Sequence, residues 1–416
     1  MTTAHHVRPT RPPRRFASYT AFAGKIERRT PAGRDRAIDG LRAIALLAVP
    51  LGHWLLGGLE LGGDGALRNA SPLSAFGFFA PVSWVLQLLG IFFLVGGYAS
   101  VRSYHRRTGS AAAWLRGRVA RLGRPVLGVA AVWAVLIPVL YALGVPGTTL
   151  RTGSTLVVQP LWFVGVYTVV TALTPYCVRA SRALGIRAAA PLLLIVAVVD
   201  LLRYGPWSDS VPSWLSVLNI LPGWLFAYQL GVIWGEGRID RVRARVLLIG
   251  GVALFAVLLL FFGYPASMVG VPGEPRTNSH PPSLLVLALA AAQSGAAILL
   301  RDRLGALLTR RPGLWAPVVV VNLSAMTILC WHQTAMLAAA VPASYAGALP
   351  GLTTAPDTLG WVVARMAWLP MFAGLLLLIG RYVRVFEPPW HRARPATRAL
   401  AAALATAFAL YALYPA

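Results

Sequence analysis

Charge is scarce in this chain of 416 residues, because only 12% of them are Asp, Glu, Lys or Arg. Soluble globular domains carry about 25% charged residues, roughly twice this fraction. Hydrophobic residues make up 57% of the chain, and its mean hydropathy is +0.65. This composition excludes an ordinary soluble protein and predicts an all-α, polytopic membrane helix bundle.

Acidic residues are especially few, with 13 Asp and Glu against 38 Lys and Arg. Almost none falls inside an apolar run, and Asp200 and Glu236 lie only near the ends of such runs. Transporters coupled to protons or sodium usually need acids within the membrane, and metal-dependent glycosyl transfer needs carboxylate ligands. Both activities are therefore disfavoured, and no metal site is predicted.

The motifs of several large protein classes are missing too. The two cysteines, Cys177 and Cys330, lack the spacing of a zinc or redox motif. The chain has no Gly-rich nucleotide loop, no HExxH and no GxSxG. Its net charge of +25 comes from basic clusters between apolar runs, as in membrane proteins oriented by their loops. No nucleic-acid partner is therefore expected.

Apolar runs long enough to cross a bilayer recur along the chain. A spanning helix needs about 20 mostly apolar residues, and about eleven segments approach that length. They are predicted near 37–57, 81–101, 125–144, 158–177, 188–202, 214–235, 246–263, 283–300, 316–339, 361–380 and 399–414. The expected fold is a bundle of about 10 to 11 transmembrane helices.

Basic residues alternate between the predicted loops. If the N-terminus is cytoplasmic, every inward loop is rich in arginine, whereas the outward loops carry little besides four arginines. These four are Arg68, Arg151, Arg203 and Arg276. The asymmetry follows the positive-inside rule. It predicts a multi-pass protein of the plasma membrane, embedded in the lipid bilayer with its N-terminus in the cytoplasm.

The chain divides into three expected regions. Residues 1–35 are predicted to form a disordered basic arm held near anionic lipid. Arg14-Arg15-Phe16 in this arm faintly resembles a twin-arginine signal, but a long apolar stretch and a cleavage site do not follow. Residues 36–390 are expected to form the helix bundle. Residues 391–416 would add a helix that either spans the membrane or lies along its interface.

The first predicted span contains an arginine and a histidine, Arg42 and His53. On an α-helix, the eleven residues between them turn about 1100°, some 20° past three full turns, and rise about 16 Å. Both side chains therefore lie on one stripe of the helix at two depths. Ionisable groups inside a bilayer are costly and commonly functional, so this stripe is a candidate site.

A second histidine, His332, is predicted at the depth of His53, because each lies about sixteen residues into an outward-running span. Either histidine alone is more often a satisfied polar group than a catalyst. Arg42 also has structural explanations, either snorkelling to headgroups or an i,i+3 pair with Asp39. The shared depth favours a common site. A histidine base without carboxylates is suited to acyl transfer to a hydroxyl.

Two loops contain further candidates. In the inward loop 102–124, arginines recur at helical spacing and either contact lipid headgroups or dock a phosphorylated cofactor. They are Arg116, Arg118, Arg121 and Arg124. The outward loop 264–282, which contains Asn278, is either a turn stiffened by proline or a lip over an outward-facing site.

Several segments resemble the acyltransferase-3 family of integral membrane O-acyltransferases. The first span matches the family pattern of an arginine, ten residues and a histidine. The matching segments are DGLRAIA at 39–45, GHW at 52–54, GIFFLVGGY at 90–98, RGRVARLGRP at 116–125, QPLWF at 159–163, LCWH at 329–332 and FEP at 386–388. The chain departs from the family at Gly96, where serine is common, and lacks the usual tyrosines near His332.

The resemblance implies a bundle of roughly ten spans that transfers an acyl group, often acetyl, from cytoplasmic acyl-CoA to a hydroxyl. The acceptor would be a glycan, a lipid or a metabolite. His53 would be the general base, with His332 as the alternative, and Arg42 with the four loop arginines would bind the donor. No permanently bound cofactor is expected, since acyl-CoA is a substrate.

Other residues near these motifs are candidate substrate contacts. They are Asp39, Trp54, Tyr98, Trp162, Asn278 and Trp331. The indole of Trp162 or Trp331, or the Asn278 amide, would stabilise the oxyanion. Two other classes of function stay open. One is a transporter or flippase of a lipid-linked or hydrophobic solute, and the other is a non-catalytic membrane scaffold.

Overall fold

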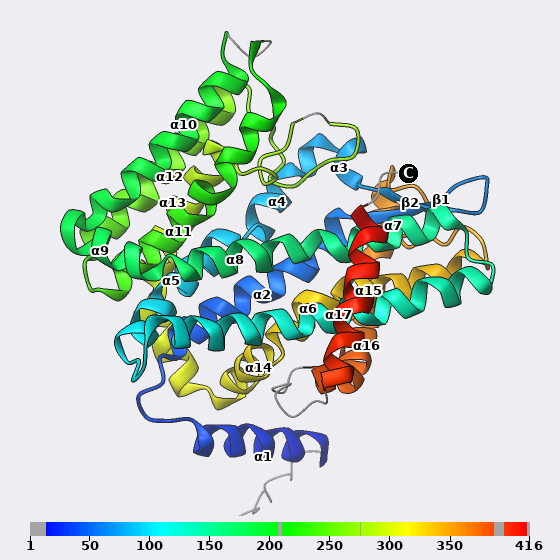
Figure 1. Ribbon diagram of the computed structural model, residues 1–416, viewed down its shortest axis with the longest axis horizontal. Helices are drawn as coiled ribbons and strands as arrows, with labels where there is room; N and C mark the ends of the chain where they lie inside the picture. The colour runs from blue at the N-terminus through cyan, green and yellow to red at the C-terminus, as the bar shows by residue number, and fades with distance from the viewer. Residues whose placement is uncertain (1–13, 207–209, 275, 387–394, 414–416) are drawn as a thin grey trace, which may run out of the picture.

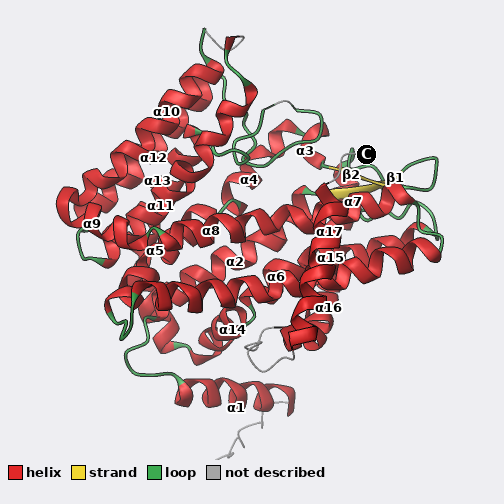
Figure 2. Cartoon of the chain, viewed as in Figure 1, coloured by secondary structure: helices red, strands yellow, loops and turns green. Residues whose placement is uncertain are grey.

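The computed structural model describes residues 14–206, 210–274, 276–386 and 395–413 as a bundle of helices (Figures 1 and 2). The first helices are α1 (Arg14–Arg29), α2 (Arg36–Leu56), α3 (Pro72–Ala75), α4 (Ala80–Leu86), α5 (Leu89–His105), α6 (Ala111–Ala142), α7 (Gly147–Val158), α8 (Trp162–Ala172) and α9 (Thr174–Leu184). The others are α10 (Ala190–Tyr204), α11 (Ile220–Gly235), α12 (Arg241–Phe261), α13 (Leu284–Arg310), α14 (Pro312–Leu323), α15 (Ala325–Ser344), α16 (Leu359–Val383) and α17 (Pro395–Leu413). The all-α fold class is confirmed.

The number of membrane spans agrees with the sequence. Within the described residues, nine helical stretches are long and apolar enough to cross a bilayer. A tenth forms if α14 and α15, which are bent by 77° at a short break, act as one broken span. The apolar part of α17, Ala396–Ala412, is shorter, and α17 packs against α6.

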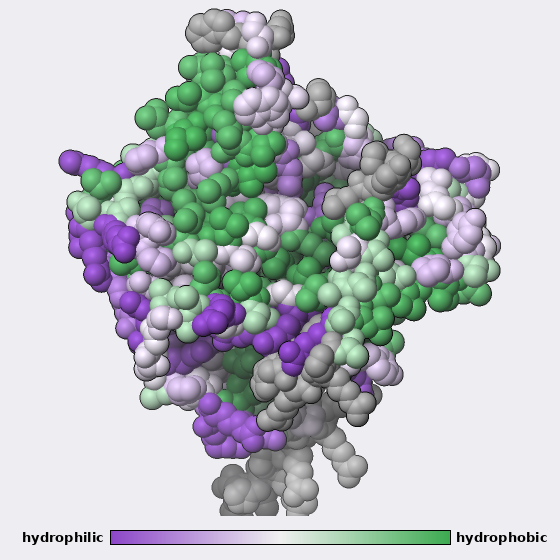
Figure 3. Space-filling model, in the orientation of Figure 1, coloured by the Kyte–Doolittle hydropathy of each residue, from purple (hydrophilic) through white to green (hydrophobic). Residues whose placement is uncertain are grey.

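The surface of the bundle is suited to contact with lipid. Figure 3 shows apolar residues over much of the visible face, with hydrophilic residues gathered mainly toward its edges. Large apolar side chains such as Leu194 on α10, Ile249 on α12 and Leu377 on α16 are more than 60% exposed. Soluble monomers rarely expose contiguous apolar patches above a few hundred Å², so this surface requires an apolar solvent.

Glycines allow α5 and α11 to pack backbone against backbone. A Cβ atom added at Gly97 would lie 2.1 Å from the carbonyl oxygen of Tyr228, and one added at Gly231 would lie 1.9 Å from that of Leu94. Neither position has room for a side chain. Small residues at such contacts are typical of helix pairs in membranes.

Two features differ from the sequence-based expectation. Residues 14–29 form α1, although the whole segment 1–35 was expected to be disordered; residues 1–13 lie outside the described residues. Contacts with α14 and α2 hold α1 and offset the entropy of ordering it. Residues 58–70 also contain a small antiparallel hairpin, β1 (Gly58–Leu61) and β2 (Leu67–Ala70), that the hydropathy pattern did not predict.

Candidate active site

His53 on α2 and His332 on α15 contact each other directly. The Nδ1 atom of His53 is 2.7 Å from the Nε2 atom of His332. The two rings are stacked, with centroids 5.0 Å apart and planes within 9° of each other. The structure therefore brings together two histidines that lie 279 positions apart in the chain.

The other contact of His332 determines which ring nitrogens carry protons. Its Nδ1 atom is 3.0 Å from the carbonyl oxygen of Ile328, which can only accept a hydrogen bond. Neutral His332 therefore carries its proton on Nδ1, and its Nε2 accepts a hydrogen bond from Nδ1–H of His53. This assignment leaves Nε2 of His53 unprotonated, as a general base requires.

His53 lines a cavity of about 140 Å³, called here the histidine cavity. One part of its wall is apolar, with Val49, Leu89 and Phe163 among its residues. Another part carries four amide side chains. These are Asn69, Gln87, Gln159 and Gln333. The cavity therefore combines a mainly apolar wall with a few groups that bind hydroxyls through hydrogen bonds.

Gln333, the residue after His332, lines this cavity and has a buried polar atom without a partner. Its side chain is only 3% exposed, and its Oε1 atom has no hydrogen-bond partner among the described residues. A buried acceptor without a partner costs about 1–3 kcal/mol.

The end of α2 beside His53 is fixed by a buried arginine. Trp54 Nε1–H donates to the carbonyl oxygen of His332 at 3.1 Å. Arg365 on α16 is fully buried, and its Nε–H donates to the carbonyl of Trp54 at 2.6 Å. Its Nη2–H donates to the carbonyl of Gly57 at 3.0 Å. Within the described residues, no carboxylate pairs with Arg365.

A second cavity, of about 870 Å³, lies at the opposite end of α2 and is called here the arginine cavity. Seven guanidinium groups line it. They belong to Arg34, Arg42, Arg102, Arg106, Arg107, Arg118 and Arg121. Guanidinium groups form paired hydrogen bonds with phosphate oxygens, so this cavity is suited to a ligand with several phosphates.

The two cavities are separate in this structure. Along α2, the arginine cavity reaches Arg42 and the histidine cavity begins at Ala48, a helical rise of about 9 Å. No described residue lines both cavities. A ligand that contacts both Arg42 and His53 would therefore have to extend past this segment of α2.

A family model described as an acyltransferase domain, acyltransferase-3, matches residues 35–380. The chain belongs to the acyltransferase-3 family. Neither a curated protein nor a solved structure matches it. The match to this acyltransferase family starts at the N-cap of α2 and ends within α16, so it includes both histidines and Arg42 but neither α1 nor α17.

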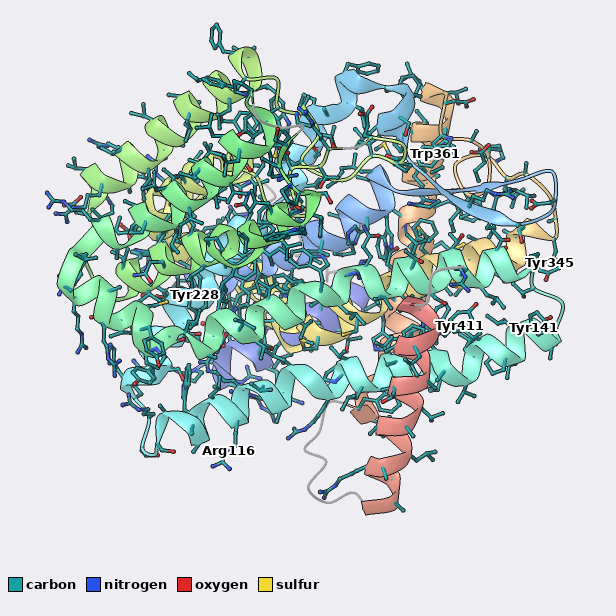
Figure 4. All side chains as sticks on the ribbon, turned by 45° about the horizontal axis from the view of Figure 1, so that its top comes forward. Arg116, Tyr141, Tyr228, Tyr345, Trp361 and Tyr411 are labelled. Carbon is teal, nitrogen blue, oxygen red and sulfur yellow. The ribbon has the colours of Figure 1, made fainter. Side chains whose placement is uncertain are left out.

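Only two of the four loop arginines of this acyltransferase line the arginine cavity. Arg118 and Arg121 line the arginine cavity, whereas Arg116 and Arg124 do not. Figure 4 shows Arg116 pointing away from the bundle. The four arginines lie on one continuous helix, α6, whose 3.6-residue period carries them to different faces. The structure therefore brings only Arg118 and Arg121 of the four to this cavity.

Asp39 and Tyr98 also lie at the arginine cavity rather than at the histidines. Asp39 is buried and is ion-paired with Arg34, and its Oδ1 lies 3.6 Å from Arg42 Nη1. The hydroxyl of Tyr98 is 3.1 Å from an amino group of Arg102. The expected i,i+3 pair of Asp39 with Arg42 is therefore present.

Among the candidate oxyanion donors, only Trp162 lines the histidine cavity. The Asn278 amide donates to the carbonyls of Pro265 and Ser267 at 2.6 and 2.8 Å, and its oxygen accepts from the Ser283 hydroxyl. Asn278 is thus used within its own loop, whereas Gly270, Ser279 and His280 of the same loop line the histidine cavity, so both interpretations of this loop stay open. Trp331 is buried in an apolar cluster and does not line the cavity.

Trp54 supports His332 through its hydrogen bond, but its side chain is absent from the cavity wall.

The sequence analysis did not identify the four amide side chains of the histidine cavity. Gln159 and Gln333 adjoin the motifs QPLWF and LCWH, so their positions were available as a signal. Asn69 and Gln87 lie in segments without a motif, and only the fold brings them to the cavity.

Proposed function

We propose that this acyltransferase moves a short acyl group, such as acetyl, from cytoplasmic acyl-CoA to a hydroxyl of a glycan, a lipid-linked molecule or a small molecule. The reaction would take place in the plasma membrane, without a permanently bound cofactor. The observation that carries the proposal is the hydrogen bond between His53 and His332, which leaves a basic nitrogen on a residue that lines a cavity with four amide side chains.

In the proposed reaction, Nε2 of His53 takes the proton of the acceptor hydroxyl as its oxygen attacks the thioester carbonyl. The resulting tetrahedral intermediate collapses, the carbon–sulfur bond breaks and the ester forms. The leaving CoA thiolate then takes the proton from His53, which restores the neutral base. His332 keeps its proton on Nδ1 throughout and orients His53.

The wall of the histidine cavity supplies the other proposed contacts. The indole N–H of Trp162 would donate to the oxyanion that develops on the thioester carbonyl. Gln333 and Gln159 would bind hydroxyls of the acceptor. A cavity of about 140 Å³ is small beside typical ligand pockets of roughly 300–1,000 Å³, which supports a short acyl group.

The arginine cavity would hold the nucleotide phosphates of acyl-CoA, with Arg118 and Arg121 on one side and Arg42 on the other. The pantetheine arm would then extend along α2 toward His53. Because the two cavities are separate, this step requires the side chains between Arg42 and Ala48 to move apart when the donor binds.

The direct test uses purified protein in proteoliposomes with radiolabelled acetyl-CoA and an envelope extract as the source of acceptors. We expect release of CoA together with a labelled acceptor. Movement of solute without a labelled product would favour a transporter. Absence of CoA release with every extract would favour a scaffold.

The donor site is tested with two arginines of the same helix. Arg121→Gln should raise the KM for acetyl-CoA about 10-fold, because it removes one charge-assisted bond to phosphate. Arg116→Gln is the matched control and should leave this KM unchanged, since Arg116 does not line the cavity. Equal effects of the two substitutions would contradict the proposed donor site.

A further inference from the structure

A third cavity, of about 750 Å³, lies between α1 and α14 and is called here the α1–α14 cavity. Figure 1 shows α1 along the edge of the molecule, beneath α14. The wall comes from α1 and the turn after it, from the first two turns of α2, from α14 and from Arg384 beyond α16. The family match starts only at residue 35, so α1 lies outside it.

Specific bonds hold α1 in place and so define this cavity. The hydroxyl of Tyr19 donates to the carbonyl oxygen of Gly313 at 2.6 Å. At the other end of α1, the indole of Trp315 donates to the Thr30 hydroxyl at 2.8 Å. Glu27 also forms an ion pair with Arg36 of α2. The space beneath α14 is therefore a structured pocket.

The walls of the cavity are mainly apolar. Phe22 and Ile26 of α1 form one wall, and Val319, Val320 and Leu323 of α14 form the other. Phe22 and Leu323 are 45% and 75% exposed, so the described residues leave a substantial part of each uncovered. A hydrocarbon chain between these walls would remove that apolar surface from water.

Positive charge gathers at the same cavity. Four arginines line it with a single carboxylate, Asp39, which is already paired with Arg34 and lies near Arg42. Within the described residues, the other two arginines, Arg29 and Arg384, form no ion pair. Their guanidinium groups are suited to a phosphate diester.

The position of the cavity along α2 fits a lipid headgroup. The 21 residues of α2 span about 31 Å, close to the roughly 30 Å hydrocarbon thickness of a bilayer. The start of α2 therefore lies near the headgroups. The beginning of α14 and the end of α16 lie beside the start of α2. The phosphate of a bound lipid would therefore lie at the membrane surface, and the acyl chain of the lipid would run inward.

We propose that the α1–α14 cavity binds one anionic phospholipid. The phosphate contacts Arg29 and Arg384, and an acyl chain lies between Phe22 and Leu323. This site is separate from the histidine cavity, although Arg34, Asp39 and Arg42 line both it and the arginine cavity. Arg29 and Arg384 line only the α1–α14 cavity, and the proposal does not depend on acyl transfer. A lipid here joins α1 to α14 and thereby stabilises the end of the bundle beside Arg42.

The test measures lipid binding to the purified full-length protein by native mass spectrometry, using dioleoyl phosphatidylglycerol and dioleoyl phosphatidylcholine as probes. We expect one tightly bound phosphatidylglycerol and weaker phosphatidylcholine. Arg29→Gln or Arg384→Gln should weaken phosphatidylglycerol binding about 5-fold each, and the double variant about 30-fold. Arg245→Gln is the matched control, because this exposed arginine of α12 lies outside the cavity.

A second variant tests the apolar wall. Val320→Trp should fill the space between α1 and α14 and displace the lipid, while the thermal stability without lipid shows whether the bundle still folds. The proposal is overturned if both lipids bind equally, or if Arg245→Gln weakens binding as much as Arg29→Gln.

Discussion

At the scale of single residues, the two histidines have different roles although they touch. His332 is fully buried, and its two ring nitrogens are both engaged, one with Ile328 and one with His53. His53 has one engaged nitrogen and one that is left for the substrate. This asymmetry follows from one backbone carbonyl, which fixes the tautomer of the pair.

The asymmetry predicts a specific pattern of kinetic losses. His53→Ala should lower kcat by roughly 10²-fold or more, a typical general-base contribution. His332→Ala should lower kcat less, by about 10-fold, because His53 would remain but could adopt either tautomer. The double variant should be no slower than His53→Ala, since the two residues act as a unit. Steady-state acyl transfer by purified, correctly inserted protein gives all three values.

Two other patterns of kinetic loss would contradict this assignment of roles to His53 and His332. Near-normal turnover by His53→Ala, combined with a large loss for His332→Ala, would make His332 the base. Losses that multiply in the double variant would show that the histidines act independently. The KM for acyl-CoA serves as the control, because neither histidine lies at the arginine cavity.

The residues also show where sequence reasoning reaches its limit. Depth along a span follows from the helical rise alone, so the proximity of His53 and His332 could be anticipated. Which way Arg116 and Arg118 point depends on how α6 is rotated against its neighbours. That rotation is set by packing with α8, α15 and α17, and no spacing within one helix reveals it.

At the scale of the helix, the bonds at the C-terminal end of α2 determine how His53 is held. The last carbonyls of a helix have no partner within it, and in α2 two of them find side chains. Ser71 donates to the carbonyl of Leu56 at 2.6 Å, and Arg365 donates to that of Trp54. Because Trp54 directly follows His53, these bonds also fix the catalytic candidate.

Arg365 is therefore predicted to be a positioning residue. Arg365→Lys should lower both the melting temperature and kcat, because one ammonium cannot reach three carbonyls that the guanidinium joins. Each buried carbonyl left without a donor costs about 1–3 kcal/mol. The KM for acyl-CoA should stay the same, since the donor cavity is at the other end of α2.

Arg381→Gln provides the comparison for Arg365→Lys, because Arg381 lies exposed at the far end of the same helix. Thermal unfolding and steady-state kinetics should hardly change in that variant. If Arg365→Lys kept wild-type kcat while losing stability, the residue would be structural only. A raised KM without a change in kcat would place it in donor binding instead.

At the scale of the whole molecule, hydropathy predicted the bundle well because lipid imposes one rule on every span. Each needs about 20 apolar residues with internally bonded backbone. Hydropathy did not predict the hairpin β1–β2 or the helix α1, because the rule applies only to segments that cross the membrane. Their structure comes from local pairing and from contacts such as Tyr19 with Gly313, which are remote in sequence.

The orientation of the bundle is the last prediction. Arginines gather at the ends of α5, α9 and α13 and at the start of α12. If successive spans cross the membrane in opposite directions, all of these ends lie on the face where α2 begins. The positive-inside rule places that face in the cytoplasm. Both native cysteines, Cys177 and Cys330, are buried, so introduced cysteines can be labelled with little background.

An impermeant maleimide added to sealed, right-side-out vesicles should label Gly63→Cys in the β1–β2 turn but not Thr108→Cys between α5 and α6. Gly63 has open space around it and an exposed position, so the substitution should not disturb the hairpin. Opening the vesicles with detergent should make Thr108→Cys reactive, which controls for folding. Labelling of Thr108→Cys alone in sealed vesicles would reverse the orientation and place the arginine cavity outside, away from cytoplasmic acyl-CoA.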